Sequence, residues 1–356
     1  MTRPLTNLMI TAIGPASSVQ DGGRYGAQRY GLTPSGAMDP LAFATANALA
    51  GNDIVTAAIE IGPFAAEIAA TGGPVHLALS GASRPAAIGG RTLPMPQSFN
   101  LKNGETLKLG FARGGAFSYL AIAGGVPGEP MFGSLAVNAR AGLGSPYPRP
   151  LQAGDAFNIS DSSPRSDQTI DLPPRADGPI RVVLGPQDDE FSDEMKALFL
   201  DSDWAVSATS DRMGFRLEGP AIKHLHGHNI VSDGTVLGSI QVPGNGAPIV
   251  LMPDRGTSGG YPKIATVISA DIGRFAQTPA GKTFRFKAVS MNEAQREKRA
   301  FVALMMSLPS LVHEWRDGLF DLDQLFKANV AGVAVNAIDA RTWQTDIDAN
   351  QMDGQP

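Results

Sequence analysis

Short apolar runs, rich in β-branched residues, alternate with clusters of turn residues along most of the chain. In the first half they include HLALSG, ETLKLGF and FSYLAIAGG, and IRVVLGPQ opens a second series near residue 180. Runs of this length at this spacing are typical of antiparallel β barrels or sandwiches. The pattern therefore predicts a mostly β protein with two β-rich halves.

Helical spacing of apolar residues interrupts this pattern in a few places. In DPLAFATANALAGN, Asp39 can cap a helix that ends before Gly51. Further on, NEAQREKRAFVALMMSL predicts a longer helix that ends at Pro309. GLFDLDQLFKANV predicts another short helix after it. We therefore expect a few short helices and a helical C-terminal segment.

A polar stretch, SDSSPRSDQTIDLPPRADGP, runs from Ser160 to Pro179 and has the composition of a linker. The sequence therefore predicts an N-terminal β domain at 1–160, a linker at 161–179, a C-terminal β domain at 180–290 and a helical segment at 291–356.

Composition narrows the function classes. The 356 residues carry a formal net charge of -5, with no cluster of Lys and Arg among aromatics, so nucleic acid is not an expected partner. No run of 18 apolar residues occurs, so we expect no membrane association. Cysteine is absent, which excludes thiolate chemistry and fits a cytoplasmic protein.

The densest polar cluster lies in PIVLMPDRGTSGGYPKIATVISAD, between two runs that read as buried strands. Paired glycines let the backbone approach a ligand, and successive amides can hold an anion. The hydroxyl groups can hold a carbonyl or carboxylate oxygen, and the Asp254 carboxylate can orient a neighbouring group. The candidate catalytic residues are Asp254, Thr257, Ser258, Tyr261 and Lys263, with Gly259 and Gly260 as backbone contacts to substrate. The alternative is a long polar loop that satisfies its own backbone.

Other polar side chains are candidates for substrate binding. Gln241 lies within an apolar run, and Gln277 follows a later one. Arg24 lies in QDGGRYG, a stretch too rich in glycine to build core. Arg212 can hold a carboxylate with two hydrogen bonds or tie down carbonyl groups. Arg274 is expected to make ordinary surface hydrogen bonds.

Three alternating histidines in KHLHGHN would face one side of a strand, which is a conceivable metal site. No carboxylate with ligand spacing accompanies them, so no metal is predicted. The sequence also contains no Walker loop, G-x-S-x-G elbow or dinucleotide fingerprint, which disfavours those enzyme classes.

Six motifs occur in a characteristic order between residues 14 and 285. They are VQDGGRYG, SGAMD followed by AN, YLAIAGG, SDRMGFRLEG, GSIQVP, and DRGTSGGYPKIATVISAD followed by AQ. With these motifs the sequence resembles the biotin-dependent carboxyltransferase family. That family includes the C-type subunit of 5-oxoprolinase, allophanate hydrolase subunit 2-like proteins and part of the urea carboxylase carboxyltransferase domain. The resemblance implies two cyclophilin-like β-barrel domains.

The resemblance also implies a function shared with a partner. In 5-oxoprolinase, ATP drives opening of a lactam ring jointly with other subunits, and urea carboxylase moves a carboxyl group from carboxybiotin to urea. We therefore expect ATP used by a complex, or carboxybiotin carried on another polypeptide. The expected partner resembles allophanate hydrolase subunit 1 or the B-type subunit of 5-oxoprolinase. The expected substrate is a small amide, lactam or urea-like molecule, whose oxyanion the donors at 257–260 are suited to hold.

The first half departs from the family pattern at three positions. Ser83 stands where Asp is usual, Phe117 where Arg is common, and Leu135 where Arg normally follows GS. In the second half, Ser258 keeps the hydroxyl of the usual Thr. The lost charges keep a second interpretation open, in which the chain is a non-catalytic regulatory protein that binds and sequesters its partner, like the family's antagonist of a sporulation-kinase inhibitor.

Overall fold

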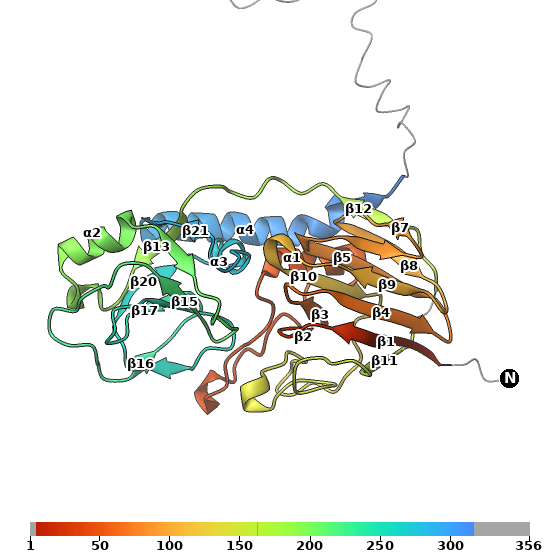
Figure 1. The fold of residues 1–356 in the computed structure, drawn as a ribbon, viewed down its shortest axis with the longest axis horizontal. Coiled ribbons are helices and arrows are strands. Elements are labelled where there is room, and N and C mark those ends of the chain that lie inside the picture. The colour runs from red at the N-terminus through yellow and green to blue at the C-terminus, as the bar shows by residue number, and fades with distance from the viewer. Residues whose placement is uncertain (1–4, 162, 317–356) are drawn as a thin grey trace, which may run out of the picture. The chain divides into compact units, whose positions relative to one another are not determined.

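The computed structural model describes residues 5–161 and 163–316 (Figure 1). The described residues up to Trp315 belong to one compact unit. Strands predominate over helices among them, which confirms the expected mostly β fold. The short helix predicted at 318–330 lies outside the described residues.

Two sheets build the first β-rich half. One is six-stranded, in the order β11 (Ala156–Ile159), β1 (Thr6–Ile13), β4 (Ala66–Thr71), β9 (Thr106–Leu109), β6 (Ala86–Ile88) and β7 (Arg91–Thr92). The other is seven-stranded, in the order β2 (Ser18–Gln20), β3 (Ala58–Ile61), β10 (Arg113–Ile122), β5 (Val75–Ser83), β8 (Gln97–Leu101), β12 (Gln168–Ile170) and β23 (Val312–Glu314).

Alternation along the strands explains how these sheets enclose a core. In β1, Leu8 and Ile10 are buried while their neighbours are partly exposed, as a half-buried strand requires. Leu8 and Ile10 share one hydrophobic cluster with Leu77 and Phe99 of the second sheet. Gly81 of β5 has a φ of +100°, and a Cβ there would lie 2.6 Å from the carbonyl oxygen of Phe117, so the close approach of β10 requires glycine.

The second β-rich half is built on one eight-stranded sheet. Its order is β21 (Thr283–Phe284), β14 (Trp204–Val206), β15 (Gly214–Glu218), β18 (Ile249–Leu251), β17 (Ser239–Gln241), β20 (Lys263–Val267), β13 (Ile180–Leu184) and β22 (Phe286–Ala288). A two-stranded ladder joins β16 (Asp233–Gly234) to β19 (Ser258–Gly259). Helices α2 (Asp193–Asp201) and α3 (Ile272–Ala276) and the 3-10 turns η1 (Gln28–Tyr30), η2 (Ala139–Ala141) and η3 (Asp188–Glu190) complete the connections.

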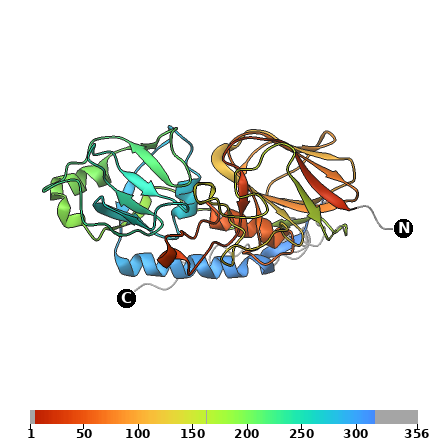
Figure 2. The same cartoon turned by 90° about the horizontal axis from the view of Figure 1, so that it is seen from below.

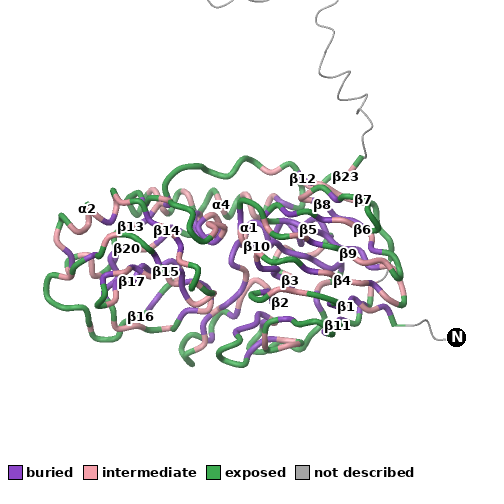
Figure 3. Tube along the Cα trace, viewed as in Figure 1, coloured by how far each residue is buried: buried purple, intermediate pink, exposed green. Residues whose placement is uncertain are grey.

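Helix α1 (Pro40–Leu49) confirms the helix predicted in the first half. The Asp39 carboxylate accepts a hydrogen bond from the amide of Ala42, so it caps the helix as expected. Every residue from Leu41 to Leu49 is buried, so α1 is a core helix and not an amphipathic surface helix (Figure 3). Its hydrophobic cluster includes Phe275 of the second half, so the two halves share a core.

The stretch predicted as a linker is partly regular structure. Within 161–179, β12 forms backbone pairs with β8 and with β23. Helix α4 (Met291–Leu311) contacts both α1 and β13, and the chain then returns to the first half through β23 (Figures 1 and 2). The seven-stranded sheet and α4 thus connect residues on both sides of the proposed linker. The division into domains stays a prediction.

The end of α4 differs from the expectation. Pro309 lies inside the helix, which continues to Leu311. Proline has no backbone N–H to donate to the helix. The hydroxyl groups of Ser307 and Ser310 donate to the carbonyl oxygens of Leu304 and Ser307, and these bonds support the last turn. Within the described residues, no helix combines the length and apolar character needed to cross a membrane.

Candidate active site

The glycine-rich loop between β18 and β20 is not a plain hairpin connection. Gly259 of β19 pairs with Asp233 of β16, and the amide of Thr235 donates to the carbonyl of Thr257. Within the described residues, no hydrogen bond is made by the side-chain hydroxyls of Thr257 and Ser258 or by the amides of Gly256 and Thr257. The loop therefore presents several unused donors.

Asp254, at the start of this loop, is held by Arg212. The Arg212 Nε lies 2.9 Å from Asp254 Oδ2, and Nη2 lies 3.1 Å from Oδ1. The amide of Asp254 also donates to the Arg212 carbonyl. A guanidinium that binds a carboxylate through two nitrogens fixes its orientation. Asp254 is therefore positioned before any substrate binds.

Arg212 in turn is anchored to the first half through a buried acid, Glu60. Arg212 Nη1 lies 2.5 Å from Glu60 Oε1, and Nη2 donates to the Gly36 carbonyl at 2.7 Å. The other Glu60 oxygen accepts hydrogen bonds from the Tyr119 hydroxyl and the Met38 amide, both at 2.8 Å. All three nitrogens of the Arg212 guanidinium are thus used by the protein, which makes Arg212 a positioning residue.

Burial and charge act in opposite directions on this group of residues. Burial raises the pKa of Glu60, although Arg212 and the hydrogen bonds to the carboxylate oppose the shift. Burial also raises the pKa of Tyr119, and the negative charge of the neighbouring Glu60 adds to that effect. Desolvation would lower the pKa of Arg212, but Glu60 and Asp254 outweigh it and raise the value. Arg212 therefore stays charged, and Asp254 keeps its partner.

A pocket of about 630 Å³ lies between the two halves beside these residues. Asp254 and Arg212 contribute its charged wall, while Phe64, Phe117 and Met213 contribute apolar wall. A mostly apolar pocket with a few placed polar groups is typical of a small-molecule site. Of the predicted loop residues, Asp254 is the one that lines this pocket.

Sequence reasoning did not select Glu60. It lies in β3, whose four residues Ala58–Ile61 are all buried. The available signal was a single acid inside the apolar run AAIEIG, because a buried carboxylate needs a specific partner.

The other second-half candidates form a separate cluster at the β16–β19 ladder. Lys263 is 2% exposed, and its Nζ lies 2.9 Å from Asp233 Oδ2. Gln241 donates weakly to the Tyr261 carbonyl at 3.5 Å. A Cβ on Gly259 would lie 2.4 Å from Gln241 Nε2, so a larger residue there would displace the end of that side chain. The ion pair gives Lys263 a structural partner within the protein.

The structure does not bring Gln277 and Arg24 to the pocket. Gln277 Oε1 accepts from the amides of Ala116 and Phe117, and its Nε2 donates to Asp39. Arg24 is fully buried in the first half, where it donates to the carbonyls of Met131 and Ala136. Gln277 is therefore occupied by the fold, whereas Arg24 keeps one buried nitrogen, Nη1, that makes no hydrogen bond among the described residues.

Arg274 makes ordinary hydrogen bonds, as expected, to the carbonyls of Gly178 and Pro179 and to Asp271.

The three histidines of KHLHGHN are not on a strand, because residues 221–232 have no regular structure. His224 instead contacts the Val242 carbonyl through Nε2. Among the described residues, no group of three or more His, Asp or Glu is arranged to hold a metal ion.

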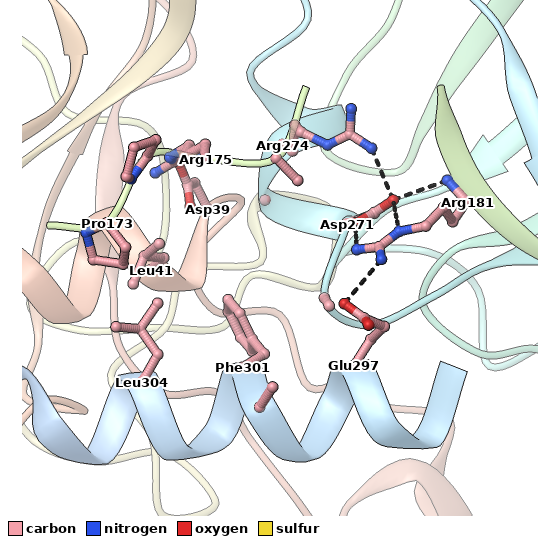
Figure 4. Close-up of a pocket in the computed structure, with 15 residues that line it drawn as sticks. Asp39, Leu41, Pro173, Arg175, Arg181, Asp271, Arg274, Glu297, Phe301 and Leu304 are labelled. Atoms are coloured by element: carbon pink, nitrogen blue, oxygen red, sulfur yellow. Dashed lines mark hydrogen bonds and ion pairs between the residues drawn. The ribbon is translucent and has the colours of Figure 1, made fainter. Parts of the chain in front are cut away.

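A second, smaller pocket of about 220 Å³ is lined by an ion-pair network (Figure 4). Asp271 accepts hydrogen bonds from the Arg181 and Arg274 side chains, and Arg181 also pairs with Glu297 of α4. On the facing side, Arg175 pairs with Asp39. Each cation here has a carboxylate partner, so this network ties segments together and offers no spare positive charge to a ligand.

The three departures from the family pattern have different surroundings. Ser83 is exposed at the end of β5, and the Leu135 amide donates to Asp21. Phe117 is 6% exposed and lines the larger pocket. The change at Phe117 therefore makes that pocket more apolar than an arginine would.

Fold and site together define the class of protein. It is a mostly β protein in which a positioned carboxylate lines a pocket and is followed in the chain by a glycine-rich loop with unused hydroxyl and amide donors. The chain belongs to the family described as carboxyltransferase domain, subdomain A and B, whose model matches residues 30–288.

Named relatives support this assignment. The chain is 36% identical to the C-type subunit of 5-oxoprolinase from Escherichia coli, over 82% of this chain and 94% of the relative. It is 34% identical to the corresponding 5-oxoprolinase subunit of Haemophilus influenzae, over 80% of this chain and 91% of the relative. The solved urea amidolyase of K. lactis superposes with a TM-score of 0.79 at 26% identity, covering 91% of this chain. The match spans only 21% of that larger chain.

Proposed function

We propose that this chain is the C-type subunit of a 5-oxoprolinase-type amidohydrolase that opens a lactam ring in complex with a partner subunit. The observation that carries the proposal is Asp254, fixed by Arg212 at the edge of a pocket and followed by a loop of unused donors. Similarity over nearly the whole length of two proteins named as this 5-oxoprolinase subunit favours this reaction over others of the family.

The predicted residues of the glycine-rich loop, together with Lys263 and Gln241, have the following roles in this proposal. Asp254 accepts a hydrogen bond from the substrate nitrogen, and the hydroxyls of Thr257 and Ser258 donate to the carbonyl oxygen. Donors placed before the reaction stabilise the charge that develops on that oxygen. Tyr261, which is 39% exposed, supplies an aromatic surface, and Lys263 supplies positive charge beyond its pairing with Asp233. Gln241, Gly259 and Gly260 shape the backbone behind the loop.

The residues of the larger pocket do not fit a nucleoside triphosphate. Arg212 is fully engaged with Glu60, Gly36 and Asp254, and Arg140 is exposed and pairs with Asp211. We therefore assign ATP use to the complex and not to this pocket. The apolar wall of Phe64, Phe117 and Met213 fits an uncharged ring, such as a lactam or the bicyclic ring of carboxybiotin.

The proposed partner resembles the B-type subunit of 5-oxoprolinase or allophanate hydrolase subunit 1, and the proposed compartment is the cytoplasm. Both oxoprolinase relatives are named as one subunit of an enzyme, which supports the existence of other subunits.

A second candidate function is transfer of a carboxyl group from carboxybiotin, carried on another polypeptide, to a urea-like amide. The backbone similarity to the K. lactis urea amidolyase favours it. The same donors would serve, because this transfer also develops charge on an amide-type carbonyl oxygen.

The deciding experiment measures ATP hydrolysis by the complex of this chain with its native partner subunits, with and without 5-oxoproline. We expect 5-oxoproline to stimulate hydrolysis, and Asp254→Asn to abolish the stimulation while the complex still forms. Asp177→Asn is a matched control, because Asp177 is exposed and distant in sequence from the loop. A stable wild-type complex without stimulation would count against the proposal and favour carboxyl transfer or a purely regulatory role.

A further inference from the structure

Arg255, which follows Asp254 in the glycine-rich loop, is a buried cation that has no hydrogen-bond or ion-pair partner among the described residues. It is 5% exposed, and its Nε is enclosed without any hydrogen bond. Within residues 5–161 and 163–316, no hydrogen bond or ion pair reaches its guanidinium. This contrasts with Arg212, whose guanidinium has three protein partners.

An unpaired buried charge is costly, so a protein rarely keeps one without a use. Burial lowers the pKa of Arg255, and the nearby Tyr25 phenol opposes this. The influence of Tyr25 places the first-half loop QDGGRYG near Arg255. The neighbouring Asp254 carboxylate is bound to Arg212 through both oxygens, and within the described residues no hydrogen bond or ion pair joins it to Arg255.

The chain on the C-terminal side of Arg255 adds donors and no free carboxylate. The amides of Gly256 and Thr257 and the hydroxyls of Thr257 and Ser258 make no hydrogen bond within the described part of the chain. The Gly256 carbonyl is already an acceptor for the Thr235 hydroxyl at 2.5 Å, which fixes the peptide at the base of the loop. A cation that is followed directly in the chain by unused donors is suited to an anion.

We propose that Arg255, together with the unused amides of Gly256 and Thr257, binds the carboxylate of a small-molecule substrate. The planar guanidinium matches a carboxylate through two parallel hydrogen bonds. The inference rests on the proposed function, because it assigns the site to a lactam that carries a carboxylate. The two adjacent residues then have different roles. Asp254 lines the pocket, and Arg255 selects a substrate that carries a negative charge.

The experiment compares two ligands that differ in the carboxylate alone, 5-oxoproline and 2-pyrrolidinone. Binding of each to the complex with the partner subunits is measured calorimetrically for wild type, Arg255→Met and Arg255→Lys. We expect Arg255→Met to weaken 5-oxoproline binding by about 10- to 100-fold, the effect of losing a charged hydrogen-bonded pair, and to leave 2-pyrrolidinone binding unchanged. Arg255→Lys should recover part of the preference. Arg216→Met, which removes an exposed arginine, is the matched control.

Stability separates this role from a structural one. Because Arg255 has no partner among the described residues, Arg255→Met is expected to unfold at the same or a higher temperature than wild type. Equal loss of both ligands, an unchanged preference for 5-oxoproline, or loss of the partner subunit from the complex would each overturn the inference.

A simple carboxylate distinguishes failure of this inference from failure of the proposed function. Acetate is titrated against the full chain, and the NMR signal of the Arg255 Nε–H is followed. A shift that saturates, without any turnover of 5-oxoproline by the complex, would retain the carboxylate site and reject the oxoprolinase assignment. Turnover without such a shift, and with an unchanged ligand preference in Arg255→Met, would retain the enzyme and reject the site.

Discussion

Gln277 donates from Nε2 to Asp39 Oδ2 at 2.9 Å, and this bond joins residues 238 positions apart. Asp39 caps α1 in the first half, and Gln277 follows α3 in the second. The same glutamine accepts hydrogen bonds from the amides of Ala116 and Phe117 and donates to the Phe117 carbonyl. A side chain predicted to bind substrate therefore connects the two β-rich halves.

We expect Gln277→Ala to destabilise the protein by about 2–4 kcal/mol, because it leaves several polar groups between the halves unsatisfied. The measurement is the free energy of unfolding from urea titration. Gln152→Ala is the control, because Gln152 is exposed. If both variants have the stability of wild type, Gln277 is not a structural connection and its role as a ligand contact regains weight.

Arg212 provides a second test, because its three guanidinium nitrogens hold Glu60, Gly36 and Asp254 at once. A lysine has one ammonium group and cannot reproduce this fork. We expect Arg212→Lys to destabilise the fold by about 2–4 kcal/mol, since Glu60 loses a buried partner. We also expect it to lower kcat of the complex by at least about tenfold, because Asp254 is no longer fixed.

Arg216→Lys is the control for Arg212→Lys, since it makes the same change four residues away at an exposed position. Unfolding and turnover should be measured on both variants. Normal turnover in Arg212→Lys, together with reduced stability, would show that Asp254 does not depend on Arg212 for its position.

The sequence could predict the fold because the fold depends on local patterns. The apolar runs predicted β5, β10 and β13, and Asp39 predicted the start of α1. Strand periodicity and helix capping can be read from the sequence because they involve neighbouring residues. Features that these patterns do not include were missed. The burial of α1 on every side depends on residues that are distant in sequence, and the last turn of α4 at Pro309 is supported by side-chain hydrogen bonds of Ser307 and Ser310.

The site was predicted in part for a related reason. Residue type marked Asp254, Thr257 and Ser258 as a chemical cluster, and the structure places Asp254 at a pocket. Whether an arginine is free or occupied depends on tertiary contacts. Arg24 and Arg212 were chosen for their charge but are held by carbonyls and carboxylates. Arg255, in the same loop as Asp254, was left out, although no partner reaches it within the described residues.

The Lys263–Asp233 pair tests whether the lysine has a structural role. Lys263 is 2% exposed, whereas the Asp233 side chain is 50% exposed. Removing the acid leaves a buried ammonium group unpaired, while Lys263→Met removes the buried charge itself. We therefore expect Asp233→Asn to be less stable than Lys263→Met by about 1–3 kcal/mol.

Thermal and urea unfolding of both single variants and the double variant measure this difference. The double variant should recover most of the stability that Asp233→Asn loses. Equal stability of all variants would mean that the pair adds nothing to the fold, and loss of turnover in Lys263→Met alone would then support the catalytic role predicted for the lysine.

The Asp271 carboxylate should make the stability of the protein depend on pH. Its side chain is 2% exposed and accepts hydrogen bonds from the amide and guanidinium of Arg181 and from Arg274 (Figure 4). Burial alone would raise the pKa of Asp271, but the bonds from Arg181 outweigh burial and lower it below the ordinary value of 3.8. The folded state therefore binds the proton less readily than the unfolded state.

From this sign, the stabilisation by Asp271 is fully present above pH 3.8 and is lost as the pH falls through the lower, folded-state pKa. Asp271→Asn should cost about 3–5 kcal/mol near neutral pH, because Arg181 and Arg274 lose a buried partner. Its difference from wild type should shrink as the pH falls through the folded-state pKa. Urea unfolding across that range measures the effect, with Asp177→Asn as an exposed control. A difference that stays constant with pH would show that the carboxylate charge does not stabilise the network.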